Sequence, residues 1–210
     1  EPAAAAAEAA RSHAAAAGDP VREAEALAFS GYALGEAGLG HLARAVALLE
    51  PTGEQIALEG ALLLLGDVQN KAGRHEAAIA TFERCRAICE ALGYDAERGV
   101  VLVNLGLAQL ALGQPAPAIT ALTEAVRLAR AHGNRYAVAG ALAQLARAEA
   151  QAGKPERVAE RLAEARAIAA ELGQAYLATF VEEAAALATA APPAAPAPLP
   201  FGMGPGMMNL

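Results

Sequence analysis

A fixed spacing of glycines constrains this chain more than any other feature of its sequence. Two series of glycines each advance in steps of 40 residues: Gly53, Gly93, Gly133 and Gly173, and Gly73, Gly113 and Gly153. Between these glycines, apolar residues recur with the period of an α-helix, as in the stretch 100–113. Such repetition predicts an extended array of helical units, in which each unit packs mainly on its neighbours.

The composition also indicates an all-α protein. Hydrophobic residues make up 55% of the sequence but aromatic residues only 4%. Alanine and leucine, which favour helices, supply the difference. No run of about 18 strongly apolar residues occurs, so we expect no insertion into a membrane.

Charge and cysteine content narrow the classes of function. The net charge of −7 argues against nucleic-acid binding, because that function needs a basic surface to neutralise phosphates. The two cysteines, four residues apart, form no disulfide framework of the secreted type, so we expect a cytoplasmic protein. Fourteen of the sixteen basic residues are arginine, and with the alanine content this is typical of a GC-rich bacterial genome.

The glycines and prolines divide the chain into two parts. We expect residues 1–190 to form one helical repeat domain, which begins with a thin alanine-rich helix at 1–17. The units lie at about 20–53, 54–93, 94–133 and 134–173, followed by a terminal helix at 174–190 that has no partner. Proline, glycine and methionine dominate residues 191–210, which predicts a flexible tail.

One pattern of residues recurs in these units and resembles the tetratricopeptide repeat. In the central unit it comprises Leu102, Leu105, Gly106, Gln109, Gly113, Ala118, Leu122 and Ala125. The neighbouring units carry similar sets: Leu62, Leu65, Gly66, Gly73, Ala78, Phe82 and Cys85, then Leu142, Leu145, Ala146, Gly153, Val158, Leu162 and Ala165. The 40-residue step is similar to that of kinesin light chains, LGN-type scaffolds and transcription regulators of the MalT type. The resemblance implies a right-handed superhelical solenoid of antiparallel helix pairs.

In tetratricopeptide repeat proteins, the first helices of the units line a concave face that generally binds peptides. We therefore expect a scaffold that binds an extended apolar peptide or partner segment there, without a cofactor. The residues expected to form this groove are Leu63, Asp67, Asn70, Val100, Val103, Asn104, Leu107, Gln144 and Arg147. The amide of Asn104 can both donate to and accept from a peptide backbone. In the alternative interpretation, this amide only bonds a neighbouring helix.

Two other classes of function stay open at this stage. The chain could be a sensory domain of a larger kinase or transcription regulator, with a peptide or small ligand in the same groove. An enzyme is the third hypothesis, but the sequence contains no nucleophile motif or aligned catalytic dyad.

The cysteines and the tail each have two interpretations. Cys85, Cys89 and His75 could ligate a metal, but a fourth ligand is lacking and Cys85 occupies a small core position of the repeat. We therefore expect two reduced, metal-free packing residues. The tail carries apolar residues that could act as a tethered ligand for the groove, or mediate self-association, or simply be disordered: Phe201, Met203, Met207, Met208 and Leu210.

Overall fold

The computed structural model describes residues 18–190, all of whose regular elements are helices. The α-helices are α2 (Pro20–Leu34), α3 (Leu39–Leu49), α4 (Gln55–Lys71), α5 (His75–Leu92), α6 (Asp95–Ala111), α7 (Pro115–Ala131), α8 (Arg135–Gln151), α9 (Pro155–Leu172) and α10 (Ala175–Thr189). Short 3-10 helices, η1 (Gly35–Gly38) and η2 (Glu50–Thr52), complete the first unit. None of the described helices is long and apolar enough to cross a membrane. The expected helix at 1–17 and the tail at 191–210 lie outside the described residues.

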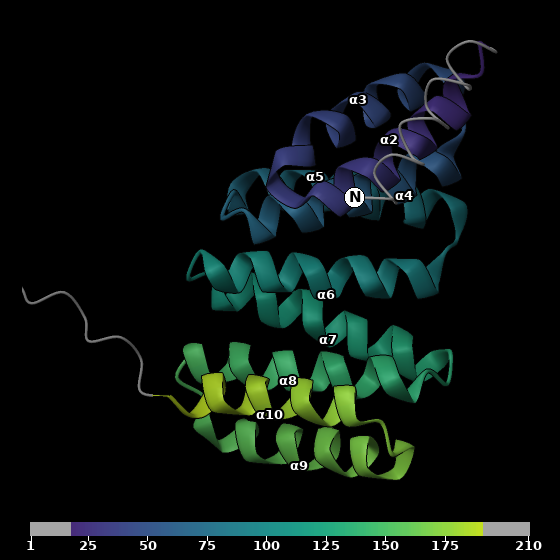
Figure 1. Ribbon diagram of the computed structural model, residues 1–210. Coiled ribbons are helices and arrows are strands. Elements are labelled where there is room, and N and C mark those ends of the chain that lie inside the picture. Colours follow the sequence, from purple (N-terminus) through teal and green to yellow (C-terminus); the bar gives the residue numbers. More distant parts are fainter. Residues whose placement is uncertain (1–17, 191–210) are drawn as a thin grey trace, which may run out of the picture.

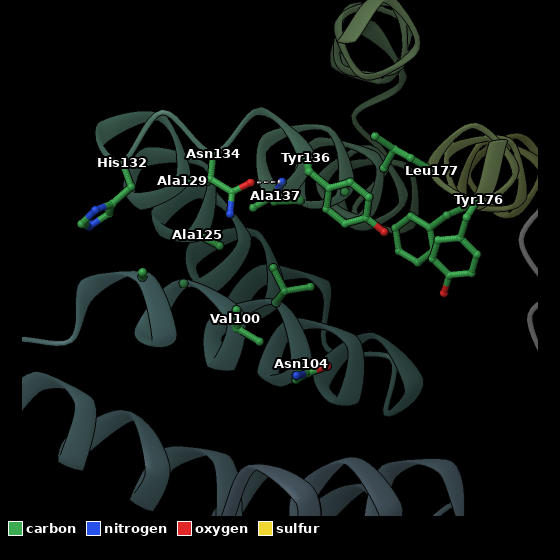
Figure 2. Close-up of a pocket in the computed structure, with 16 residues that line it drawn as sticks. Val100, Asn104, Ala125, Ala129, His132, Asn134, Tyr136, Ala137, Tyr176 and Leu177 are labelled. Carbon is green, nitrogen blue, oxygen red and sulfur yellow. Dashed lines mark hydrogen bonds between the residues drawn. The ribbon is translucent and has the colours of Figure 1, made fainter. Parts of the chain in front are cut away.

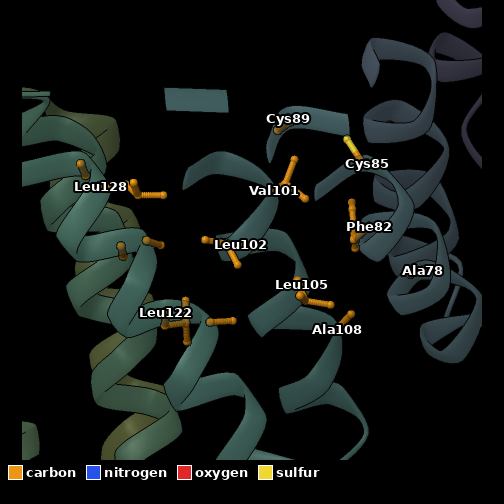
Figure 3. Packing of buried hydrophobic residues seen from close by; sticks show 14 of the residues in the cluster. Ala78, Phe82, Cys85, Cys89, Val101, Leu102, Leu105, Ala108, Leu122 and Leu128 are labelled. Atoms are coloured by element: carbon orange, nitrogen blue, oxygen red, sulfur yellow. The ribbon is translucent and has the colours of Figure 1, made fainter. Parts of the chain in front are cut away.

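The helices stack in chain order as antiparallel pairs, which confirms the all-α solenoid (Figure 1). The pairs are α2 with α3, α4 with α5, α6 with α7, and α8 with α9. The second helix of a pair also packs on the first helix of the next pair, as α5 does on α6 and α7 on α8. Figure 3 shows apolar residues of α6, among them Leu102 and Leu105, between those of α5 and α7.

Local sequence explains where these helices begin and end. Pro115 and Pro155 occupy first helical positions, where the missing N–H removes no helical hydrogen bond. The side chain of Asn134 caps α8 by accepting a hydrogen bond from the backbone N–H of Ala137 at 3.0 Å. After α5, Gly93 adopts a left-handed φ of 69°, which closes the turn to α6 without strain on a Cβ.

The first helix of the first unit is shorter than the first helices of the later units. It ends at Leu34, and the 3-10 helix η1 follows. Gly35 makes this earlier stop possible with a φ of 59°. Gly31 and Gly38 then lie in contact, since a Cβ on Gly38 would overlap the carbonyl oxygen of Gly31.

The last helix packs differently from the first helices before it. By its spacing, α10 begins a fifth unit, because Gly173 precedes it as Gly133 precedes α8. However, α10 packs more extensively on α8 than on α9, whereas α6 and α8 pack mainly on the second helix that precedes each of them. Figure 1 shows α10 lying across α8 and α9. Within the described residues no second helix follows α10 to form a pair with it, and α10 instead covers part of α8.

Candidate functional site

A pocket of about 330 Å³ lies where α10 meets the two central units. Its walls come from α6, α7, α8 and α10, so four helices of three successive units contribute to one cavity. Figure 2 shows Tyr136 of α8 and Tyr176 of α10 on one side of the pocket, with Val100 and Asn104 of α6 facing them across it. We call this cavity the central pocket.

The central pocket is mainly apolar and open to solvent. Val100, Tyr136 and Tyr176 are 48%, 40% and 75% exposed, an unusual degree of exposure for large apolar or aromatic side chains. The space between them exists because alanine and glycine form the floor, including Ala125 and Gly140. A Cβ on Gly140 would lie only 3.7 Å from Cε1 of Phe180, so the ring of Phe180 lies close over this glycine.

Few polar side chains line the central pocket, and they differ in exposure and in whether they already make a hydrogen bond. The Asn134 side chain already accepts the hydrogen bond that caps α8. His132 is exposed at the end of α7. The amide of Asn104, which is half-buried, makes no side-chain hydrogen bond to any residue within 18–190. Its donors and acceptor are therefore available to a bound molecule.

The structure brings together only some of the residues that we expected in one groove. Val100, Val103 and Asn104 all line the central pocket. Leu63 packs against the core and Leu107 is half-buried, and neither lines this pocket.

Three polar residues of the expected groove are engaged or covered. Asp67 bonds Lys71 at 2.7 Å, and Asn70 bonds Nδ1 of His75 at the same distance. The Gln144 side chain is only 4% exposed, because it lies on α8, which α10 covers. The Gln144 side chain is thus not available to a partner in this structure.

Arg147 borders a second depression, which has a larger volume of about 1120 Å³. This depression lies at the C-terminal ends of α6, α8 and α10, whereas the central pocket lies toward their N-terminal ends. Arg147 is half-buried, and this burial lowers the pKa of its guanidinium. No carboxylate among the described residues forms an ion pair with it.

Sequence reasoning missed three aromatic residues of the central pocket: Tyr136, Tyr176 and Phe180. A signal for two of them was present, because Tyr136 and Tyr176 are 40 residues apart and so occupy equivalent positions in successive units. The groove expected from the sequence did not include residues of the terminal helix. The contact of α10 with α8 is what brings Tyr176 to the site.

A second cluster of reactive side chains lies away from this pocket. The carboxylate of Glu59 and the thiols of Cys85 and Cys89 lie within 4.8 Å of one another, and all three residues are buried. The metal site considered from the sequence comprised Cys85, Cys89 and His75, without Glu59. The structure pairs His75 with Asn70, while Glu59 of α4 faces the two cysteines of α5.

Comparisons with known proteins agree with this architecture. Residues 58–131 match the sequence model of the tetratricopeptide repeat family. Among curated proteins, no sequence matches the chain. Several solved structures have a similar fold. The apo form of RapI superimposes with a TM-score of 0.76 at 15% identity, over 88% of this chain and 53% of that one.

Two further structures show how widely the fold is shared. Aspartyl phosphate phosphatase F from Bacillus subtilis has a TM-score of 0.70 at 19% identity, covering 81% of this chain and 46% of its own. BtubC from P. vanneervenii has a TM-score of 0.58 at 16% identity, covering 97% of this chain and 98% of its own. The chain thus spans about half the length of RapI and of aspartyl phosphate phosphatase F, and nearly all of BtubC. At such identities these similarities establish the fold alone.

Proposed function

This chain is a tetratricopeptide repeat protein, and we propose that it is a binding module that holds an extended apolar segment of a partner protein or peptide. The observation that carries this proposal is the central pocket. Val100, Tyr136 and Tyr176 leave a large apolar surface in water around a cavity that is already formed. Concave sites of this kind, with few polar groups, are typical of specific ligand binding.

The size of the pocket favours one anchoring side chain. A cavity of about 330 Å³ is at the lower end of the range for ligand sites, so it would accommodate one large apolar or aromatic residue and its flanking backbone. Burying such a side chain contributes about 1.5–3 kcal/mol. The open sides of the pocket would let the rest of the segment continue along α6 and α8 in either direction.

Asn104 supports an extended backbone as the partner's conformation. Its amide, which makes no side-chain hydrogen bond within residues 18–190, lies beside the apolar wall formed by Val100 and Val103. An amide that accepts one hydrogen bond and donates another can pair with both groups of one peptide unit. Asn104 would thus align the segment while the pocket holds its side chain, and Leu107 would extend the contact by one helical turn.

The proposal can be tested with selected peptides. We would select random peptides against the purified wild-type protein, without reference to any variant, and measure their affinities for the wild type and for a Val100→Glu variant by fluorescence polarisation. A charge at residue 100 places an unpaired carboxylate against the buried ligand, so affinity should fall at least tenfold. Leu172→Glu is the matched control, because Leu172 is 36% exposed on α9 and lines none of the described pockets.

Each outcome of this experiment is informative. Loss of affinity with Val100→Glu but not with Leu172→Glu supports the central pocket as the site. Equal affinities for both variants and the wild type would refute it. Leu107→Glu then measures how far the contact extends, and a loss with this variant alone would move the site toward the C-terminal half of α6.

A second candidate function is a sensory domain of a larger regulator. It is favoured by the participation of α10, because a ligand in the central pocket would contact the terminal helix as well as two complete units. A solved Rap protein complexed with competence and sporulation factor shares the fold, with a TM-score of 0.64 at 14% identity. Hydrogen exchange separates the two candidates: a sensor requires the whole of α10 to be protected or released on binding, whereas a plain scaffold protects only the part of α10 that lines the pocket, around Tyr176 and Phe180.

A further inference from the structure

The buried cluster of Glu59, Cys85 and Cys89 has the composition of a site for a thiophilic divalent metal ion. We propose that these three side chains bind Zn²⁺ and thereby join α4 to α5. Glu59 lies in α4, and the two cysteines lie one helical turn apart in α5. Cys85 and Cys89 are both 0% exposed and Glu59 is 8% exposed. The central pocket and its ligand take no part in this inference.

The distances within the cluster fit tetrahedral coordination. Sγ of Cys85 lies 3.6 Å and Sγ of Cys89 3.7 Å from the same carboxylate oxygen, Oε1 of Glu59. Zinc–sulfur bonds of about 2.3 Å and zinc–oxygen bonds of about 2.0–2.2 Å at a tetrahedral angle place sulfur and oxygen about 3.6 Å apart. The side chains would therefore need only small rotations to surround an ion.

The repeat itself shows that packing does not require these residues. Forty and 80 residues after Glu59 the chain has Gly99 and Ala139. The positions equivalent to Cys85 are Ala125 and Ala165, and those equivalent to Cys89 are Ala129 and Ala169. Small inert residues therefore fill the same three positions in the next two units. Of these three units, only the second has other residues than glycine or alanine at these positions, and all three of its residues are of types that ligate metals.

The electrostatics of the cluster also favour a cation. Within residues 18–190, the side-chain partners of the Glu59 carboxylate are two thiols, which are weak hydrogen-bond donors. A buried carboxylate without a strong partner is costly. A divalent ion at the cluster would pair with the carboxylate and would stabilise both cysteines as thiolates.

The ligand types determine which ion is expected. Two thiolates favour a soft or borderline ion, and the carboxylate is compatible with Zn²⁺ but is less suited to Cu⁺. Three protein ligands leave one coordination position, which a water molecule can occupy. With two thiolates and one carboxylate, Zn²⁺ gives the cluster the same net charge as the metal-free carboxylate with two neutral thiols.

We would test the site with the whole chain, stripped of metal by a chelator and kept reduced. Zinc is titrated in by calorimetry, and Co²⁺ is used as a spectroscopic probe because it shows thiolate charge-transfer and tetrahedral bands. The variant Cys85→Ala/Cys89→Ala places in α5 the alanines that α7 and α9 carry, so it should fold. His75→Ala is the matched control, because His75 begins the same helix but bonds Asn70.

We expect one Zn²⁺ per chain, thiolate bands with Co²⁺, and a higher melting temperature with zinc. The double variant should show none of these three properties. Glu59→Gln should weaken zinc binding at least tenfold, whereas His75→Ala should bind zinc as the wild type does. A folded wild-type chain that binds no zinc, or binds it as the double variant does, would disprove the site. Loss of binding in His75→Ala with retention in the double variant would also disprove it.

Discussion

Gly106 of α6 lies directly against Leu122 of α7, so closely that a Cβ on the glycine would come within 2.7 Å of Cγ of Leu122. The same relationship joins Gly66 to Phe82 one unit earlier, where the added atom would lie 2.5 Å from Cε1 of the ring. In the fourth unit Ala146 takes the small position beside Leu162. A small residue facing a large one thus sets the distance between the two helices of each pair.

This relationship predicts the effect of Gly106→Ala. In an exposed helix the substitution would stabilise by about 1 kcal/mol through helix propensity. Here the methyl group overlaps a fully buried leucine, and overpacking costs about 1–3 kcal/mol. We therefore expect a lower midpoint of urea unfolding. Gly60→Ala is the matched control in α4, because nothing lies within 4 Å of its added Cβ, and it should raise the midpoint. A stabilising Gly106→Ala would contradict the close contact.

Most of the fold could be predicted from sequence because each unit repeats the same pattern of turn glycines and apolar helix residues. The glycine spacing and apolar period predicted the helices from α4 to α9. The α10 helix shows the limit of this reasoning. Its sequence has the period of a first helix, but within residues 18–190 no second helix follows to hold it in that register, and tertiary packing places it on α8. The composition of the central pocket depends on that placement.

The metal cluster marks a second limit. Glu59 occurs in an apolar stretch of α4, where sequence alone does not show which residues of α5 face it. Cys85 and Cys89 share one face by spacing, but the third member depends on how the two helices are offset. Comparing equivalent positions in successive units would have indicated it, because Gly99 and Ala139 are the residues at that position in the later units.

One pair of buried polar positions carries different residues in different units. This variation predicts that a double substitution restores the stability that a single substitution removes. Glu149 is 1% exposed and lies 3.6 Å from Arg161, with both facing atoms lacking hydrogen bonds among the described residues. At the equivalent positions of the second unit, Thr81 donates a 2.7 Å hydrogen bond to Gln69. Arg161→Thr alone should cost about 2 kcal/mol or more, because it leaves the buried carboxylate with a distant partner.

The combined change Glu149→Gln/Arg161→Thr would recreate the neutral pair of the second unit. We expect its free energy of unfolding to lie within about 1 kcal/mol of that of the wild type, because each polar group regains a partner. Glu149→Gln alone should be intermediate, since the Arg161 side chain is 25% exposed and can turn toward water. Additive losses in the double variant would show that the two residues do not interact.

The reactivity of the cysteines should depend strongly on pH in the metal-free, folded protein. With its pKa raised to about 11, Cys89 is ionised to about one part in a thousand at pH 8, compared with about a quarter for an ordinary thiol. Since only the thiolate is alkylated, its rate with iodoacetamide should increase about tenfold per pH unit between pH 7 and 10. Peptide mass spectrometry measures both sites. Rapid labelling at pH 7, as in the urea-unfolded chain, would exclude a buried pair.

The final prediction concerns Gly140, whose lack of a side chain keeps the central pocket open. Gly140→Val would introduce into α8 the residue that α6 carries at the equivalent position, Val100. Its added Cβ would meet Phe180 at an ordinary contact distance of 3.7 Å, so the fold should tolerate it. The larger side chain would occupy space that a ligand needs.

Overpacking of a filled site by about 1–3 kcal/mol corresponds to a loss of about 5- to 150-fold in affinity for a selected peptide. Gly60→Val is the matched control, because it makes the same change at the equivalent position of α4, which does not line the central pocket. Both variants should melt near the wild-type temperature, and only Gly140→Val should bind the peptide less tightly. If Gly140→Val binds as the wild type does, the peptide does not enter the cavity between α8 and α10, and the contact must lie along the exposed face of α6 alone.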